Sequence, residues 1–139
     1  MKNLYTALAT ATGGREGHAE SNDGKLKVTL TPPKELGGPA NGTGTNPEQL
    51  FAAGYAACFE SAVRHVARAK KVTVSQSRVT SEVTLGSKDD GGFQIAVRLN
   101  VALPGIDRAT AQELVTTAHL VCPYSNATRG NVEVDITVE

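Results

Sequence analysis

The 139-residue chain lacks the features that mark several large classes of protein. Its 14 basic and 14 acidic side chains cancel, and no basic run occurs. Because phosphate binding needs clustered Lys and Arg, no nucleic-acid partner is expected. No stretch approaches the roughly 18 to 20 apolar residues of a membrane span, and the N-terminal segment MKNLYTALATATGGREGH has no apolar block of the signal-peptide type. We therefore expect a cytoplasmic location and no membrane partner.

Cysteine is also scarce, since Cys58 and Cys122 are the only two. Cytoplasmic thiols stay reduced, so a lasting structural disulfide is uncommon there. No Cys-x-x-Cys pair occurs, and a zinc site would need His119, Cys122 and the distant Cys58 together, so no metal is expected. A protease-type Cys–His pair is not supported either, because His65 lies seven residues after Cys58, about 10 Å along a helix.

The hydrophobic periodicity predicts one α+β domain, residues 1–139, with antiparallel sheets and two main helices. Strands are predicted at 3–11, 14–21, 25–31, 78–85, 93–103 and 132–138, and helices at 47–70 and 107–121. Residues 89–92 form the turn of a hairpin. The Pro- and Gly-rich segment 32–46 is long for a loop in a compact domain, which indicates a functional or mobile segment.

The first helix has a clear start and a buried first half. Asn46 can cap it, Pro47 fits the first position, and Gln49 has the spacing of a capping box. The residues that follow are apolar nearly all round, as in a helix buried in a core or an interface. Gly54 costs about 1 kcal/mol against alanine inside a helix. Because it lies four residues before Cys58 on the same face, we expect it to leave open access to the sulfur.

The second cysteine extends the inward stripe of the second helix. Cys122 lies four residues after Ala118 and seven after Val115, directly before Pro123 ends the helix. Both thiols are thus expected to point inward, each from its own helix. The spacing leaves open whether the sulfurs meet, and two small core hydrophobes remain an alternative.

A reactive cysteine needs a positive neighbour, because a free thiol is only a few per cent ionised at neutral pH. Cys58 is too far into its helix for the dipole to help. Arg15, beside the Gly13-Gly14 turn, is the candidate cation, although it can equally be a solvated turn residue. A buried arginine needs a carboxylate partner. Glu48 can be that partner, or it can simply interact favourably with the helix dipole from the first turn. Glu48 lies about 15 Å from Cys58 along the helix, so it would orient the arginine and not touch the thiol.

Two segments, TNPEQLFAAGYAACFESA (45–62) and VCPYSNATRGNVEV (121–134), closely resemble the organic hydroperoxide resistance proteins. These belong to a wider family that also contains the osmotically inducible proteins, and the resemblance covers essentially the whole chain. It implies an intertwined homodimer and a cofactor-independent peroxidase. Cys58 matches the peroxidatic cysteine and Cys122 the resolving cysteine, which would form an intramolecular disulfide. Arg15 and Glu48 match the arginine that polarises the thiolate and its carboxylate partner.

The resemblance also implies a substrate class and a reductant. Phe51, Tyr55 and Phe59 are apolar residues near Cys58 that would suit alkyl or fatty-acid hydroperoxides. A dithiol, notably a lipoylated protein, would reduce the disulfide, with no metal or other cofactor. Two alternatives remain: a redox-sensing or small apolar ligand-binding protein of the same fold without turnover, and a structural domain with buried thiols. An enzyme would consume many equivalents of peroxide, a sensor about one.

Overall fold

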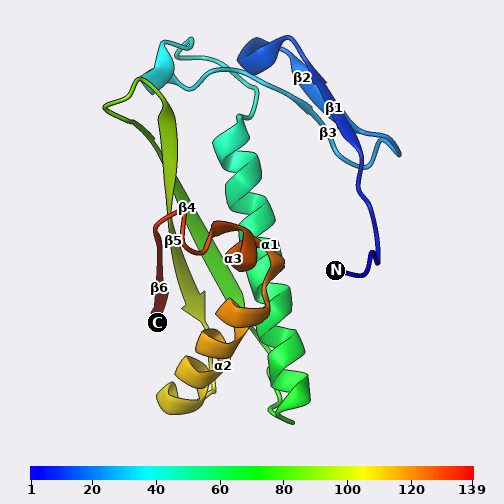
Figure 1. Cartoon of the computed structure of the whole chain (residues 1–139), viewed down its shortest axis with the longest axis vertical. Helices are drawn as coiled ribbons and strands as arrows, with labels where there is room; N and C mark the ends of the chain where they lie inside the picture. Colours follow the sequence, from blue (N-terminus) through cyan, green and yellow to red (C-terminus); the bar gives the residue numbers. More distant parts are fainter. The chain divides into compact units, whose positions relative to one another are not determined.

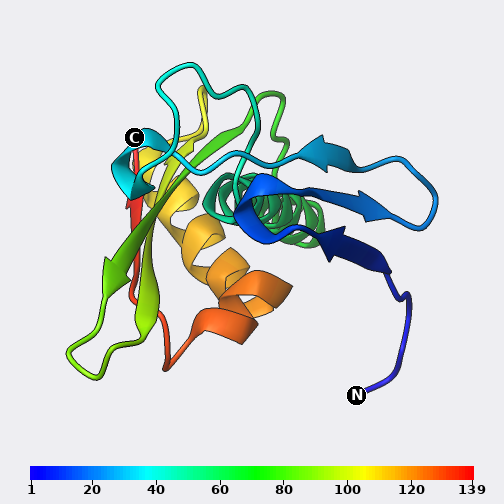
Figure 2. The same cartoon turned by 90° about the horizontal axis from the view of Figure 1, so that it is seen from above.

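The computed structural model describes all 139 residues, which form an α+β chain in two compact units, Met1–Leu50 and Phe51–Glu139 (Figures 1 and 2). The N-terminal unit contains β1 (Ala9–Thr12), η1 (Gly14–Glu16), β2 (His18–Ser21), β3 (Lys27–Thr29) and η2 (Lys34–Leu36). Helix α1 (Pro47–Ala69) starts there and continues through the C-terminal unit, which adds β4 (Arg78–Ser87), β5 (Phe93–Ala102), α2 (Arg108–Val121), α3 (Pro123–Thr128) and β6 (Val134–Val138). No helix of the chain is both long enough and apolar enough to cross a membrane.

The N-terminal unit is a three-stranded antiparallel sheet in the order β1-β2-β3. Its first strand is shorter than predicted, beginning at Ala9 and not at residue 3. The predicted strand 14–21 is a strand only in its second half. Gly13 and Gly14 both adopt positive φ (78° and 58°), and a short 3-10 turn therefore precedes β2. Leu30 is the only buried residue of this unit. The sheet is therefore almost without a core of its own.

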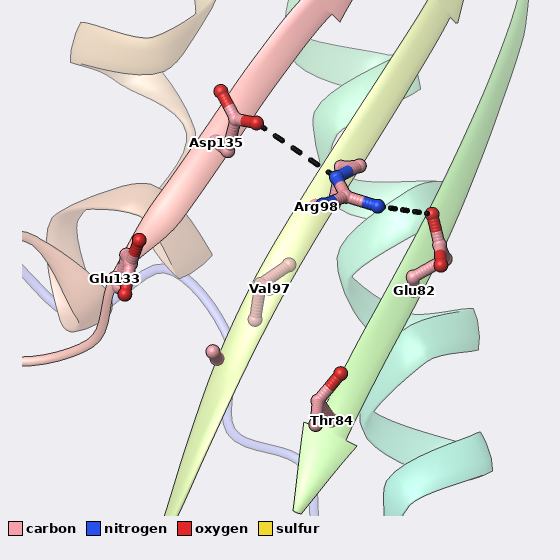
Figure 3. A pocket seen from close by; sticks show the side chains of 7 residues that line it. Glu82, Thr84, Val97, Arg98, Glu133 and Asp135 are labelled. Atoms are coloured by element: carbon pink, nitrogen blue, oxygen red, sulfur yellow. Dashed lines mark hydrogen bonds and ion pairs between the residues drawn. The ribbon is translucent and has the colours of Figure 1, made fainter.

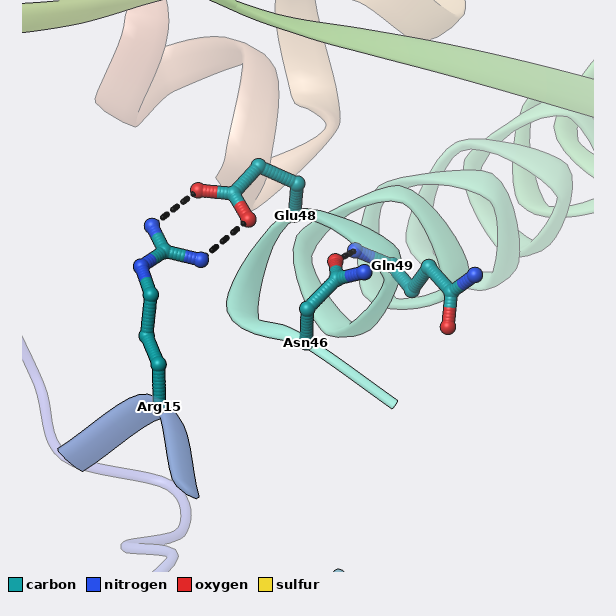
Figure 4. Close-up of polar contacts among 4 residues, drawn as sticks. All are labelled: Arg15, Asn46, Glu48 and Gln49. Carbon is teal, nitrogen blue, oxygen red and sulfur yellow. Dashed lines mark hydrogen bonds and ion pairs between the residues drawn. The ribbon is translucent and has the colours of Figure 1, made fainter. Parts of the chain in front are cut away.

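Helix α1 begins where the sequence predicts, and its cap is visible in Figure 4. The Oδ1 atom of Asn46 accepts a hydrogen bond from the backbone N–H of Gln49 at 2.8 Å, which satisfies one of the free donors of the first turn. The reciprocal half of the predicted capping box is replaced. The side-chain oxygen of Gln49 accepts from the Thr45 hydroxyl at 2.6 Å.

The sheet of the C-terminal unit has the order β4-β5-β6. Strands β4 and β5 form the predicted antiparallel hairpin, with Arg78 opposite Ala102 and Ser87 opposite Phe93. Strand β6 is parallel to β5, so the expectation of purely antiparallel sheets was wrong. The reason is the connection: α2 and α3 together carry the chain back along the sheet, which is the kind of crossover that parallel neighbours require.

The helices pack on one face of this sheet, and its other face is charged. The core is formed by buried side chains of α1, α2 and β5, among them Tyr55, Phe59, Val63, Leu99, Val101, Leu114, Val115 and Ala118. On the opposite face Glu82, Arg98 and Asp135 stand side by side on the three strands (Figure 3). The alternation of β5 between buried Val97, Leu99 and exposed Arg98 follows the period of two of a half-buried strand.

Candidate active site

The two cysteines meet inside the C-terminal unit. The sulfur of Cys58, on α1, lies 3.6 Å from the sulfur of Cys122, and both thiols are free. Because an S–S bond is about 2.05 Å long, a disulfide needs the sulfurs to approach by only about 1.5 Å. The inward orientation expected for both residues is confirmed for Cys122, which is fully buried, while Cys58 is half-buried.

Cys122 reaches this position because it forms the elbow between two helices. It is the C-cap of α2 and the N-cap of α3, with an extended backbone (φ −63°, ψ 123°). Its N–H donates to the Ala118 carbonyl and its carbonyl accepts from Asn126, both at 2.9 Å. Pro123 ends α2 as predicted, but it also opens α3, which the sequence reading missed. Proline at the first position of a helix is the signal that would have revealed α3.

Tyr124 occupies the space beside Gly54. A Cβ atom on Gly54 would lie 2.7 Å from the Tyr124 hydroxyl oxygen and 3.2 Å from two of its ring carbons. The glycine therefore makes room for an aromatic ring, and the expected open access to the sulfur was wrong. The same ring packs against Phe51 and Tyr55, with centroid separations of 5.9 and 5.6 Å. The sequence analysis did not identify Tyr124 as a residue of this site.

The substitution Gly54→Ala tests this close approach. The new methyl group must displace the flexible end of Tyr124, while alanine favours the helix by about 1 kcal/mol. We expect Tm to change by no more than about 4 °C, the shift equivalent to about 1 kcal/mol in a domain of this size. Tyr124, on the other hand, should become measurably more mobile, as read from its ring signals by NMR. Ala53→Gly, an exposed neighbour on the same helix, is the control for propensity. Unchanged Tyr124 signals in Gly54→Ala would contradict the contact.

The surroundings of Cys58 do not favour its ionised form. Burial raises the pKa of the Cys58 thiol, and the hydrogen bond to Cys122 and the like-charge repulsion between the two thiols raise it further. The backbone N–H of Tyr124 donates to the sulfur and lowers that pKa, but the net direction is upward. At neutral pH the thiol is therefore held protonated. A cation is needed to make it a nucleophile.

Arg15 and Glu48 form a bidentate ion pair within the N-terminal unit (Figure 4). The guanidinium nitrogens of Arg15, in η1, donate to the two carboxylate oxygens of Glu48, in the first turn of α1, at 2.8 and 2.6 Å. The side chain of Glu48 is only 17% exposed and that of Arg15 35%. The predicted partnership of these two residues is thus present, with the parallel geometry that only arginine offers.

This ion pair predicts an acid limit to stability. The hydrogen bond from Arg15 lowers the pKa of Glu48 below its usual 4.5. A depressed carboxyl pKa contributes stability above pH about 4.5 and loses it as the pH falls through the folded-state value. In urea unfolding, wild type should therefore exceed Glu48→Gln in stability at pH 7, and the difference should shrink below pH 4.5. The exposed Glu35→Gln is the control; a difference that persists unchanged at pH 3 would contradict the linkage.

The aromatic residues predicted to line a substrate pocket form a continuous stack on α1. Phe51 lies edge-on to Tyr55 at 6.1 Å, and Tyr55 to Phe59 at 6.5 Å. Tyr55 and Phe59 are fully buried, whereas Phe51 and the neighbouring Tyr124 retain exposed surface. In the C-terminal unit the surface of this stack is therefore formed by Phe51 and Tyr124.

A hollow lies on the outer face of the C-terminal sheet, and its lining is charged (Figure 3). Arg98 pairs there with Glu82 at 3.4 Å and with Asp135 at 3.8 Å, and all three side chains are more than half exposed. Exposed pairs of this kind contribute little. The hollow contains no thiol or histidine, and nowhere in the chain do three or more His, Cys, Asp or Glu residues gather as a metal site would need.

Comparison with known proteins identifies the family. A family model for OsmC-like proteins matches residues 40–137. An organic hydroperoxide resistance protein of Xanthomonas axonopodis pv. citri is 56% identical over 138 residues, 99% of this chain and 96% of the relative. The chain therefore belongs to the OsmC-like family, and within it to the organic hydroperoxide resistance proteins. This confirms the resemblance seen in the two sequence motifs.

Solved structures agree with this assignment. An organic hydroperoxide resistance protein of Legionella pneumophila is 54% identical and has a TM-score of 0.94, covering 99% of both chains. A Vibrio cholerae protein of the same description is 48% identical with a TM-score of 0.94, over 99% of this chain and 94% of that one. The Vibrio cholerae structure contains captopril bound in one of its active sites.

Proposed function

We propose that this protein is a thiol-dependent peroxidase that reduces organic hydroperoxides to alcohols and so protects against oxidative stress. The observation that carries the proposal is the 3.6 Å separation of two free thiols. This separation supports a nucleophile and its resolving partner better than two packing residues. Relatives named for organic hydroperoxide resistance support the choice of substrate. Residues 1–139 would act as one hydroperoxidase domain.

The chemistry proceeds in three balanced steps. The Cys58 thiolate attacks the distal oxygen of the hydroperoxide, the O–O bond breaks, and the alkoxide leaves as an alcohol after taking a proton. Cys58 is left as a sulfenic acid. The Cys122 sulfur then attacks the Cys58 sulfur, the S–O bond breaks, and water leaves with the Cys122 proton. An external dithiol finally reduces the Cys58–Cys122 disulfide by exchange.

Arg15 would provide the positive charge that the first step requires. Burial and the contact with Cys122 favour the protonated form of Cys58, so a cation is needed to stabilise the thiolate and the developing negative charge on the peroxide oxygens. We propose that Arg15 has this role and that Glu48 orients its guanidinium. This role is supported by the bidentate pairing of Arg15 with Glu48, which fixes the plane of the guanidinium.

The preferred substrates would be alkyl and fatty-acid hydroperoxides. Phe51, Tyr55 and Phe59 form an apolar stack on the helix that carries Cys58. We propose that this stack faces the organic part of the substrate, with Phe51 at its surface and Tyr55 and Phe59 behind it. An apolar wall gives binding energy to an alkyl chain and none to hydrogen peroxide.

We further propose that the protein works as an intertwined homodimer with its sites at the subunit interface. The N-terminal unit buries only Leu30, which is too little to stabilise about fifty residues. Its large apolar side chains Leu4, Tyr5 and Leu8 are all more than half exposed. A second copy of the chain would cover them. The reductant would be a lipoylated protein, acting in the cytoplasm where thiols are kept reduced.

One titration tests the function. The reduced protein receives one equivalent of an alkyl hydroperoxide or of hydrogen peroxide, and free thiols and disulfides are then measured by mass spectrometry. We expect two thiols per chain to disappear as a Cys58–Cys122 bridge, faster with the alkyl hydroperoxide, and many equivalents to be consumed once dihydrolipoamide is present. Consumption that stops at one equivalent would favour the redox sensor. Survival of both thiols would leave two packing cysteines.

A further inference from the structure

A chain of buried hydroxyl groups links α1 to the elbow that holds Cys122. The hydroxyl of Tyr55 lies 2.9 Å from the Ser125 hydroxyl and 3.2 Å from that of Thr128. The Ser125 hydroxyl in turn lies 2.9 Å from Nδ1 of His119. Tyr55 and Ser125 are fully buried and Thr128 nearly so. None of these polar groups takes part in the proposed chemistry.

Only one arrangement of protons satisfies all these contacts. The Thr128 hydroxyl donates its proton to the Ser125 carbonyl at 3.2 Å, so its oxygen must accept the proton of Tyr55. Tyr55 can then only accept from Ser125, and Ser125 can only accept from His119. His119 must therefore carry a proton on Nδ1. The chain of donors runs in one direction, from His119 inward to the Ser125 carbonyl.

The network joins the residues on both sides of the elbow. His119 lies three residues before Cys122, in the last turn of α2, and Ser125 lies three residues after it, in α3. Their hydrogen bond therefore closes the angle between the two helices. Arg129 adds a second link, since its guanidinium donates to the His119 carbonyl and, at 2.7 Å, to Oδ1 of Asn126. The direction in which Cys122 projects is thus determined by side-chain contacts on both sides of it.

The inner end of the network anchors the elbow to the helix of the other thiol. Tyr55 lies three residues before Cys58 on α1, on the same side of the helix. Within this network, the Ser125 hydroxyl is where the hydrogen bond from α1 meets the hydrogen bond from α2. Loss of these hydrogen bonds would therefore loosen the elbow that holds Cys122 opposite Cys58.

We propose that Ser125 is a positioning residue for the resolving step, holding Cys122 at attack distance from Cys58 through its hydrogen bonds to Tyr55 and His119. This inference rests on the proposed function. The affected step is the attack of the Cys122 sulfur on the Cys58 sulfenic acid, with loss of water. The network has no part in the attack of Cys58 on the peroxide. Its loss therefore slows disulfide formation selectively and lengthens the life of the sulfenic acid.

The test separates these two steps in a single turnover. Reduced wild type, Ser125→Ala, His119→Leu and His119→Asn are mixed with one equivalent of an alkyl hydroperoxide, with and without dimedone, which traps sulfenic acids. Asparagine can place a donor nitrogen where histidine has Nδ1, so His119→Asn is the rescue variant. Thr116→Ala removes an exposed hydroxyl from the same helix as the control.

For Ser125→Ala and His119→Leu we expect peroxide consumption within twofold of wild type and at least a tenfold larger share of dimedone adduct over disulfide. His119→Asn and Thr116→Ala should resemble wild type. Disulfide formation within twofold of wild type in both Ser125→Ala and His119→Leu would overturn the inference. If Ser125→Ala does not fold, His119→Leu and its rescue by His119→Asn decide, because His119 is only half-buried.

A second oxidant keeps this inference distinct from the proposed function. Diamide adds to a thiol without any peroxide chemistry, and the second thiol then displaces the adduct to form the disulfide. If wild type does not react with hydroperoxides, the proposed function fails. The rate at which Cys122 displaces the diamide adduct of Cys58 still tests the positioning role, and we expect it to fall at least tenfold in Ser125→Ala. An unchanged rate would overturn the inference.

Discussion

Replacement of Cys58 by serine is expected to abolish the reduction of organic hydroperoxides, lowering kcat/KM by at least about a thousandfold, because the alcohol is a far weaker nucleophile than a thiolate. The fold should be retained, since Cys58 is half-buried and serine is nearly isosteric. The measurement is peroxide consumption with dihydrolipoamide as reductant, checked by circular dichroism. Residual activity above about a tenth of wild type would exclude Cys58 as the attacking group.

Cys122→Ser provides the matched contrast to that variant. It keeps the proposed nucleophile and removes the partner 3.6 Å away, so it should consume its first equivalent of peroxide at the wild-type rate and then stop as the sulfenic acid. Excess peroxide should convert that group to sulfinic acid. Mass spectrometry distinguishes these products. A first turnover as slow as that of Cys58→Ser would mean that the roles of the two cysteines are exchanged or shared.

Replacement of Arg15 by alanine is expected to lower kcat/KM by about a hundredfold or more, the usual effect of losing one charge-stabilising donor. Arg15→Lys should recover little of this, because an ammonium group cannot make the two parallel hydrogen bonds that Glu48 accepts from the guanidinium. Glu48→Gln should have a smaller effect, since the arginine remains but is held less firmly. Rates of reaction of Cys58 with iodoacetamide against pH should show its pKa higher in Arg15→Ala than in wild type.

Arg78→Ala is the control for a general loss of an ion pair. Arg78 binds Glu139 at 3.1 Å at an exposed site of the C-terminal unit, and its removal should leave kcat/KM within twofold of wild type. If Arg15→Ala also stays within twofold, Arg15 serves the stability of its own unit and another cation must ionise the thiol.

The features that could be predicted from the sequence are those that depend on neighbouring residues. The start of α1 could be located because Asn46, Pro47 and Gln49 act on neighbouring backbone groups. The burial of Cys122 followed from its place in the stripe of α2. The hairpin between β4 and β5 followed from the alternation of its strands and the glycines of its turn. In each case the information lies within a few residues of the feature it predicts.

Other features depend on contacts between distant segments and were missed for that reason. The parallel pairing of β6 with β5 depends on the direction in which the chain runs after α2 and α3. The alternation of residues within a strand does not reveal that direction. The reason for Gly54 is a ring seventy residues away, and a glycine alone does not reveal which side chain it accommodates. Likewise, the spacing of Cys58 and Cys122 showed two inward thiols but not their separation. The link from Arg15 to Glu48 came from the family resemblance and from the need for a counter-charge.

The distance between the two cysteines along the chain makes the folding stability depend on the redox state. Cys58 and Cys122 are 64 positions apart, so a bridge between them would close a loop that includes β4, β5 and all of α2. In the chain-entropy description, closing a loop of that length stabilises the folded protein by about 4 kcal/mol at 25 °C. The enzyme would therefore alternate in each cycle between a more firmly folded oxidised form and a looser reduced one. Heat or a protease would act mainly on molecules that have just been reduced and await the next peroxide.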